Sequence, residues 1–228
     1  MKALSDGRLL AAASFVRPGA VFADIGTDHA YLPLHLLQQG RITRAIAADI
    51  GEGPLSRARA HIAASGMAGR VETVLTNGLQ GLEHHGLTDI AICGMGGELI
   101  VDILSASPFV REAGIRLILQ PMTRAATLRR YLASEGFAIL AERPCRAAGR
   151  VYTCLCVEHD GVRRTLTPAE AEVGRPLCES EEERDCFAEL LARRITALQE
   201  KKRALEGASL TDEEDEALLA ALLSLQQA

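Results

Sequence analysis

The amino-acid sequence predicts an α/β fold, in which a mostly parallel sheet carries helices on both faces, followed by a smaller helical domain. Up to residue 160, short apolar runs alternate with longer stretches of helical periodicity, a pattern typical of parallel β/α layering. Some of these runs, such as residues 45–49 and 89–93, are almost continuously apolar, as are strands that helices cover on both faces. From residue 161 onward the apolar spacing is helical. We therefore divide the chain into residues 1–160 and residues 161–228.

Seven strands are expected in the first domain, and the length of chain between them decides how they pair. The expected strands are residues 21–25, 45–49, 71–75, 89–93, 116–120, 137–142 and 151–158, and the expected helices are residues 5–16, 30–39, 54–65, 97–105 and 124–135. Ser5 is the expected cap of the first helix. Only residues 143–150 separate the last two strands, which is too short for a helical crossover. We therefore expect five parallel strands closed by a terminal antiparallel hairpin.

The second domain is predicted to be an α-helical hairpin of the coiled-coil type. Thr167-Pro-Ala-Glu170 has the form of a capping box with proline in the first turn, so it starts a short helix. A long helix is expected over residues 180–206, and Thr211-Asp-Glu-Glu214 is expected to cap the last one, with residues 207–209 joining the two. Their apolar residues recur every three or four positions: Phe187, Leu191, Ile195, Leu198 and Leu205 in the first, and Leu218, Leu219, Leu222, Leu223 and Leu225 in the second.

The composition is that of an ordinary globular protein. Of its 228 residues, 48% are hydrophobic and 24% charged, which excludes wholesale disorder. No apolar run reaches the ~18 residues of a membrane span, and signal-peptide cleavage near the N-terminus would cut into the first strand. We therefore expect a cytoplasmic protein. The six cysteines contain no C-x-x-C pair, so neither a disulfide framework nor a metal site is predicted. The oligomeric state stays open, and a monomer is compatible with the sequence.

Charge is distributed unevenly between the two domains. Residues 1–160 carry 16 Lys and Arg against 15 Asp and Glu, whereas residues 161–228 carry 9 against 15. The overall charge of −5 argues against a protein that coats nucleic acid without specificity, but it leaves room for a local basic patch.

The segment after the first predicted strand is the richest in candidate site residues. The strand ends in Asp24-Ile-Gly26, and ligands of open α/β sheets bind at the carboxyl ends of strands. Gly26 has no side chain, so a ligand can approach its backbone closely. Thr27-Asp28-His29 stands where a dinucleotide fingerprint needs further glycines, which disfavours a nicotinamide oxidoreductase. The acids Asp24 and Asp28 instead favour a ligand that carries a cationic amine.

The next three strand ends add complementary groups. Asp49 can accept hydrogen bonds from both hydroxyls of a ribose, or it can simply cap the following helix. Asn77-Gly78 can bind the edge of an adenine, or form a plain turn. Gly94-Met-Gly-Gly97 offers bare backbone, and a tight turn would explain only one of its three glycines. A ribose, an adenine and an amino-acid moiety together describe S-adenosylmethionine, so these turns predict a Rossmann-like methyltransferase.

At these motifs the chain resembles the bacterial TrmK-type tRNA (adenine-N1)-methyltransferases. The resemblance runs in order from about residue 4 to residue 158. It is carried by Ala23-Asp-Ile-Gly-Thr-Asp-His-Ala-Tyr-Leu-Pro33, Glu52-Gly-Pro54, Asn77-Gly-Leu79, Gly94-Met-Gly-Gly97 and Leu117-Ile-Leu-Gln-Pro121. It implies a class I methyltransferase fold, S-adenosylmethionine as cofactor, and N1 of adenine 22 in tRNA as methyl acceptor. The helical tail resembles the coiled-coil C-terminal domain of that family.

The resemblance also implies which residues form the cofactor pocket. These are Asp24, Gly26, Asp28, His29, Asp49, Asn77, Gly78, Leu79, Gly94 and Met95.

Three residues are the candidates for the chemistry at the methyl acceptor. Tyr31 is expected to stack on an adenine extruded from the tRNA, unless it fills the core. Asp28 either binds the ammonium of the cofactor or faces positive charge that develops on the purine. Gln120, with Pro121, is expected to read the adenine N6 amine, and Gly96 to lie against the substrate. His29 is expected to act as a hydrogen-bonding scaffold rather than as a catalyst.

Arginines are the candidates for contact with the tRNA backbone, because a guanidinium binds phosphate in a bidentate manner. The candidates are Arg124, Arg129 and Arg130 on one helix, and Arg143, Arg146 and Arg150 between the last two strands. Scattered solvent-facing arginines are the alternative, because the chain has 22 Arg and only 3 Lys. The other functional interpretations are a class I methyltransferase acting on another RNA, a protein or a small molecule, and a non-enzymatic RNA-binding adaptor.

Overall fold

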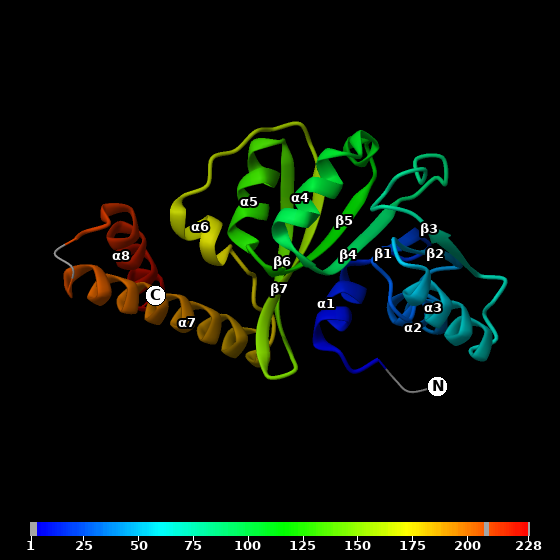
Figure 1. The fold of residues 1–228 in the computed structure, drawn as a ribbon, viewed down its shortest axis with the longest axis horizontal. Helices are drawn as coiled ribbons and strands as arrows, with labels where there is room; N and C mark the ends of the chain where they lie inside the picture. Colours follow the sequence, from blue (N-terminus) through cyan, green and yellow to red (C-terminus); the bar gives the residue numbers. More distant parts are fainter. Residues whose placement is uncertain (1–3, 208–209, 228) are drawn as a thin grey trace.

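A single mixed sheet organises the first two thirds of the chain (Figure 1). The structure is a computed structural model and describes residues 4–207 and 210–227. Within these residues seven strands pair in the order β3-β2-β1-β4-β5-β7-β6. They are β1 (Val21–Ile25), β2 (Arg44–Asp49), β3 (Val71–Leu75), β4 (Asp89–Gly96), β5 (Arg116–Thr123), β6 (Phe137–Ala147) and β7 (Arg150–His159). Strands β1 to β5 are parallel and β7 is antiparallel to both of its neighbours, which confirms the predicted topology.

Helices cover both faces of the sheet and enclose two apolar cores. Helices α1 (Gly7–Phe15), α2 (Tyr31–Gln38) and α3 (Glu52–Ala64) pack on one face. Helices α4 (Gly97–Ser105) and α5 (Ala125–Ser134) pack on the other, beside a short 3-10 helix, η1 (Pro108–Arg111). Side chains alternate along a strand, so Phe22 lies in the first core while Ala23 and Ile25 lie in the second.

Two helices begin at other residues than predicted. The cap of α1 is Asp6 rather than Ser5, because the Asp6 carboxylate accepts a hydrogen bond from the Arg8 backbone N–H at 2.9 Å. Helix α3 begins at Glu52, so Pro54 lies inside its first turn, where a missing backbone N–H costs nothing.

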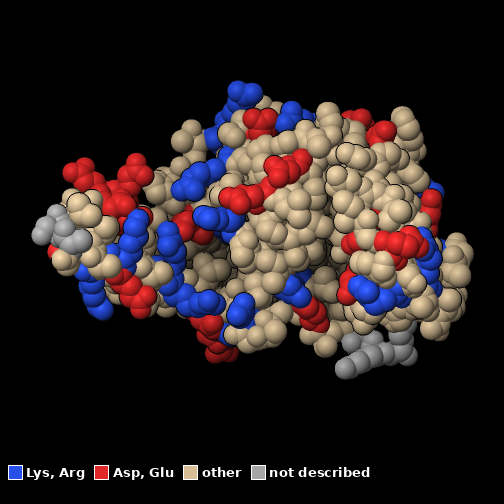
Figure 2. All heavy atoms as spheres, viewed as in Figure 1, with Lys and Arg blue, Asp and Glu red and all other residues tan. Residues whose placement is uncertain are grey.

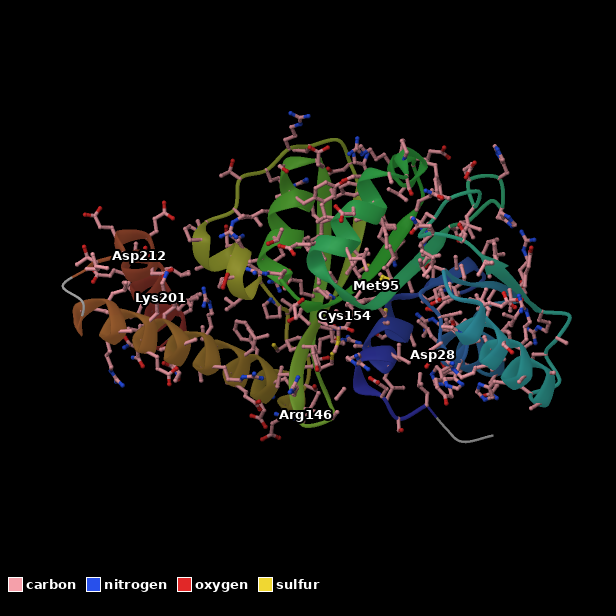
Figure 3. All side chains as sticks on the ribbon, in the orientation of Figure 1. Asp28, Met95, Arg146, Cys154, Lys201 and Asp212 are labelled. Atoms are coloured by element: carbon pink, nitrogen blue, oxygen red, sulfur yellow. The ribbon has the colours of Figure 1, made fainter. Side chains whose placement is uncertain are left out.

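The terminal hairpin is longer than predicted. Pairing of β6 with β7 continues to Ala147 and Arg150, and the turn is Ala148-Gly149, with φ angles of 47° and 72°. Positive φ at both residues is the conformation of two-residue hairpin turns that follow the twist of the strands. The hairpin extends beyond its pairing with β5, which contacts β7 only over Arg116–Leu119. Its outer half, with Arg146 at the tip in Figure 3, packs against the start of α1, and a side chain at Gly7 would collide with the Arg146 carbonyl.

The C-terminal helices form a separate core beside the sheet. They are α6 (Pro168–Val173), with the predicted capping box, α7 (Glu181–Gly207) and α8 (Glu213–Gln227). Helix α7 runs away from the hairpin and α8 folds back along it, which confirms the predicted helical hairpin (Figure 1). Residues 208–209 of the expected connection lie outside the described residues. Leu225, expected in the apolar stripe, is exposed. None of the described helices is both long and apolar enough to span a membrane.

A buried ion pair joins α5, β6 and α6. Arg129 is only 1% exposed, and its Nε lies 2.9 Å from Oε1 of Glu142. Its Nη2 donates to the other carboxylate oxygen at 3.2 Å, and its Nη1 donates to the carbonyls of Ala171 and Glu172, both at 3.1 Å. The prediction that Arg129 contacts RNA is therefore wrong, because its donors are engaged inside the protein.

The first testable prediction concerns this ion pair. Arg129→Met should lower the free energy of unfolding by about 3–5 kcal/mol, because it leaves the Glu142 carboxylate buried without a partner. Chemical denaturation measures the change. Arg130→Met, at the exposed neighbouring position, is the matched control and should shift stability by less than about 0.5 kcal/mol. Equal stability of the two variants would show that the pair does not hold these elements together.

Candidate active site

The predicted binding turns meet beside β1. The chain proceeds outward from β1 to β2 and β3, and then returns to place β4 on the other side of β1. The turns that leave β1 and β4 therefore diverge to opposite faces of the sheet and open a crevice between them. Figure 3 shows Met95, in the segment that ends β4, near the centre of the molecule, with Asp28, from the turn after β1, to one side.

Asp24 brings a buried carboxylate to the floor of this crevice. It is 7% exposed, and no described Lys, Arg or His forms an ion pair with it. Burial raises its pKa to about 6; a hydrogen bond with Thr27 opposes this shift, and the nearby charge of Asp49 adds to it. A cationic group at this place would stabilise the ionised carboxylate. The site therefore fits a ligand with an ammonium group.

The glycine segment is the bulged end of β4 rather than a free turn after the strand. Met95 and Gly96 still pair with β5, at Pro121 and Thr123, but the register shifts on both sides of Met95. Gly94 has a φ of 80°, a conformation that glycine adopts without strain. A side chain at Gly26 would collide with the terminal methyl group of Met95, so the Met95 side chain packs directly against the Gly26 backbone.

The neighbouring strand ends supply further polar groups. One carboxylate oxygen of Asp49 accepts a hydrogen bond from the Gly51 N–H at 2.7 Å, which fixes the side chain at the start of α3. Asn77 is exposed, and Gly78 has a φ of 61°. The side chain of Leu79 lies in the core, so only its backbone is available to a ligand.

The loop after β1 carries an aromatic and charged cluster. Arg57 donates two hydrogen bonds to Asp28, one of them at 2.8 Å from Nε. The ring of His29 stacks on Tyr31 with centroids 5.1 Å apart, and His61 meets Tyr31 edge-on, also at 5.1 Å. Tyr31 is 48% exposed, so it does not fill the core. Arg57 and His61 were missed in the sequence, although their spacing of four within a predicted helix places them on one face.

Gln120 is fully buried and already hydrogen-bonded. Its amide oxygen accepts from the Gly94 N–H at 3.1 Å, and its amide nitrogen donates to the Pro121 carbonyl at 2.9 Å. The side chain thus fixes the backbone of the Gly94 bulge, and its contact with a substrate stays a prediction. The sequence did not indicate that Arg8 lies near the end of β5. Its Nη1 is 2.9 Å from the sulfur of Met122, which follows Gln120 and Pro121.

The candidate arginines fall into two groups. Arg124 is 69% exposed and Arg130 is also exposed. Both line a cleft of about 770 Å³ between α5 and the C-terminal helices, and Figure 2 shows Lys and Arg beside α5 and α6 and along α7. By contrast, Arg146 pairs with Glu189 at 2.7 Å and Arg143 with Glu183 at 2.8 Å, so these two connect the hairpin to α7. Arg143, Arg146 and Arg150 lie on strands rather than in a loop.

Known proteins with similar sequences are methyltransferases. Residues 5–155 match the family described as "Methyltransferase domain". The tRNA (adenine(22)-N(1))-methyltransferase of Bacillus subtilis (strain 168) is 36% identical over 151 residues, which cover 66% of this chain and 63% of that protein. A "Putative tRNA methyltransferase" of Mycoplasma pneumoniae is 28% identical over 140 residues, covering 60% and 62%. The match spans less than two thirds of the length of both curated relatives.

Solved structures align over nearly the whole chain. Sp1610 of Streptococcus pneumoniae, a "putative tRNA (m1A22) methyltransferase" solved in complex with S-adenosyl-L-methionine, superposes with a TM-score of 0.82 and 34% identity, covering 96% of this chain and 98% of that one. The B. subtilis m1A22 tRNA methyltransferase TrmK superposes with a TM-score of 0.79 and 29% identity, covering 99% and 97%. The chain therefore belongs to the methyltransferase domain family and, within it, to the TrmK-type family.

Proposed function

We propose that this chain is an S-adenosylmethionine-dependent methyltransferase that modifies N1 of adenine 22 in tRNA. The observation that carries the proposal is the crevice beside β1, where the buried Asp24 carboxylate forms no ion pair within residues 4–207 and 210–227. The relatives named for tRNA (adenine(22)-N1) methylation, one of them solved with S-adenosylmethionine, support the choice of cofactor and acceptor. Since tRNA is the proposed partner, we expect the protein to work in the cytoplasm.

The residues of the crevice fit the cofactor group by group. Asp24 would accept a hydrogen bond from the ammonium of its amino-acid part, which accounts for a buried carboxylate that forms no ion pair with the described side chains. Asp49, held by the Gly51 N–H, would accept the ribose hydroxyls through its remaining lone pairs. Asn77 would bind the edge of the adenine, and Gly94, which has open space where a side chain would lie, would let the ligand approach the backbone.

When bound, S-adenosylmethionine supplies an electrophilic methyl group on a sulfonium. Neutral adenine has a free lone pair on N1, so no residue of this chain has to remove a proton before the transfer. The residues must instead hold the base in line, an effect worth about 7–11 kcal/mol in well-oriented reactions. Tyr31, half-exposed at the start of α2, would stack on the extruded adenine. The Asp28 carboxylate would face the positive charge that methylation leaves on the purine.

The exposed arginines of α5 would bind the tRNA backbone. Arg124 directly precedes α5, at the carboxyl edge of the sheet. It lies close to Gly97, the first residue of α4, where a side chain would collide with the Arg124 carbonyl. Arg130 forms no ion pair with any other residue in the described ranges. A phosphate would therefore meet a guanidinium that is free to form a bidentate contact.

The second testable prediction is the methylation reaction. The purified chain should transfer labelled methyl groups to a tRNA transcript with adenine at position 22, and not to the same transcript with guanine there. Nuclease digestion followed by mass spectrometry identifies the product as 1-methyladenosine. Equal labelling of both transcripts would exclude adenine 22 as the acceptor, and labelling of neither would favour a different substrate class.

The third testable prediction concerns the pH dependence of cofactor binding. Asp24 ionises near pH 6, while an α-ammonium group stays charged up to about pH 7.7. Affinity for S-adenosylmethionine should therefore rise about tenfold from pH 5 to pH 7, as the carboxylate gains its charge. Calorimetry on the wild type and on Asp24→Asn measures this rise. The variant should bind weakly and with a flat pH profile, so an unchanged profile would count against the Asp24–ammonium contact.

The fourth testable prediction concerns RNA affinity. Arg124→Ala and Arg130→Ala should each weaken tRNA binding and lower the slope of log affinity against log salt by about one, because each removes one phosphate contact. Affinity for S-adenosylmethionine should not change. Arg44→Ala is the matched control, since Arg44 is also exposed but begins β2 at the opposite edge of the sheet. Salt slopes equal to that of the wild type would remove both arginines from the interface.

A further inference from the structure

We propose that Arg57 and His61 of α3 are positioning residues that hold Tyr31 ready to stack on the target base. This inference rests on the proposed function and deepens it, because it assigns a role to two residues outside the predicted pocket. Both lie on the same face of α3, four residues apart, and both contact the loop that follows β1.

The loop has little to fix it from within. Ala30 has a φ of 54°, a left-handed conformation that is uncommon for a residue with a side chain, and it provides no side-chain cap for α2. The Thr27 hydroxyl accepts a hydrogen bond from the Ala30 N–H at 3.2 Å. Tyr31 follows directly as the first residue of α2, and almost half of its side-chain surface is exposed. Besides its stacking on His29, the direction of its ring depends on contacts from outside the loop.

Helix α3 supplies these contacts at two points. Arg57 binds the carboxylate of Asp28 through two guanidinium nitrogens, which fixes the start of the loop. His61 Nδ1 lies 2.8 Å from the backbone carbonyl of His29, and the carbonyl can only accept, so Nδ1 carries the proton. The same His61 ring meets the Tyr31 ring edge-on, with an interplanar angle of 69°.

His29 completes the support, because its ring stacks on Tyr31 at an interplanar angle of 29° and its Nε2 lies 3.4 Å from Asp28. The five side chains form one connected set that runs from α3 to the exposed tyrosine. A ring held in place before the base arrives loses less conformational freedom on stacking than a ring that rotates freely. Arg57 and His61 thus act on the target base through Tyr31.

Substitutions at His61 separate its two contacts. His61→Phe retains an aromatic ring but loses the donor to the His29 carbonyl, whereas His61→Asn retains a donor near Nδ1 but loses the ring. His61→Ala and Arg57→Ala remove each support completely. Arg59→Ala is the matched control on the same helix, because Arg59 pairs with Glu52 and donates to Thr73 at 2.9 Å, away from the loop.

The experiment combines steady-state kinetics with a fluorescent base. We expect His61→Ala and Arg57→Ala to raise the KM for tRNA about fivefold to tenfold, with smaller effects for His61→Phe and His61→Asn, and no change for Arg59→Ala. The dissociation constant of S-adenosylmethionine should stay constant in every variant. A tRNA with 2-aminopurine at position 22 should show a quenched component on the wild type, which Tyr31→Ala abolishes and His61→Ala reduces.

A double-mutant cycle tests whether His61 acts through Tyr31. In the Tyr31→Ala background, His61→Ala should have no further effect on KM or on the quenched component. A full additional effect there would overturn the inference, as would a parallel loss of S-adenosylmethionine affinity, which would make this cluster part of the cofactor site. The inference would also be overturned if His61→Ala and Arg57→Ala were active and had the same KM for tRNA as Arg59→Ala. A wild-type chain inactive on adenine 22 would instead overturn the proposed function, and the inference with it.

Discussion

The reversal of strand order beside β1 is the constraint on which the rest of the site depends. Because β4 returns to the free side of β1, the turns after these two strands leave on opposite faces and cannot fill the space between them. Close approach then requires glycine: a side chain at Gly26 would meet Met95, and Gly94 needs a left-handed φ. The buried Gln120 amide accepts a hydrogen bond from the Gly94 N–H and so connects the bulge to β5.

The crevice beside β1 is acidic, whereas the cleft beside α5 contains exposed arginines together with acidic side chains. Asp24 and Asp49 lie at neighbouring strand ends, and the charge of Asp49 adds to the burial that raises the pKa of Asp24. A polyanion such as RNA gains nothing by approaching these carboxylates, so its backbone has to be bound elsewhere. Arg124 and Arg130 lie along α5, beyond the glycine segment, and offer cations on the side that faces the C-terminal helices. A modest net negative charge is therefore compatible with RNA binding, because the arrangement of the charges matters more than their sum.

Local sequence predicted the sheet and most of its turns, because strand periodicity, helix caps and glycines act over a few residues. The cap of α1 at Asp6 and the start of α3 at Glu52 were missed locally, but the larger failures involve contacts between distant segments. The composition of residues 143–150 resembles a loop, yet they extend a hairpin that α1 and α7 support. Arg129 has the spacing of a surface residue, but Glu142 and two carbonyls of α6 bury it. Arg57 and His61 are 29 and 32 residues from their partners Asp28 and His29, so a local sequence pattern does not predict these contacts.

The β6–β7 hairpin connects the C-terminal helices to the edge of the crevice, although these helices do not line it. Its outer half passes the carboxyl end of β5, where Arg146 and Arg143 pair with acids of α7 and the Arg146 backbone packs on the start of α1. Arg8, in the first turn of α1, reaches Met122 just after the Gln120 segment. Two ion pairs and one close backbone contact thus connect α7 to the edge of the crevice. The acidic side chains of α7 thus have a structural use at this end of the helix, in addition to solvation.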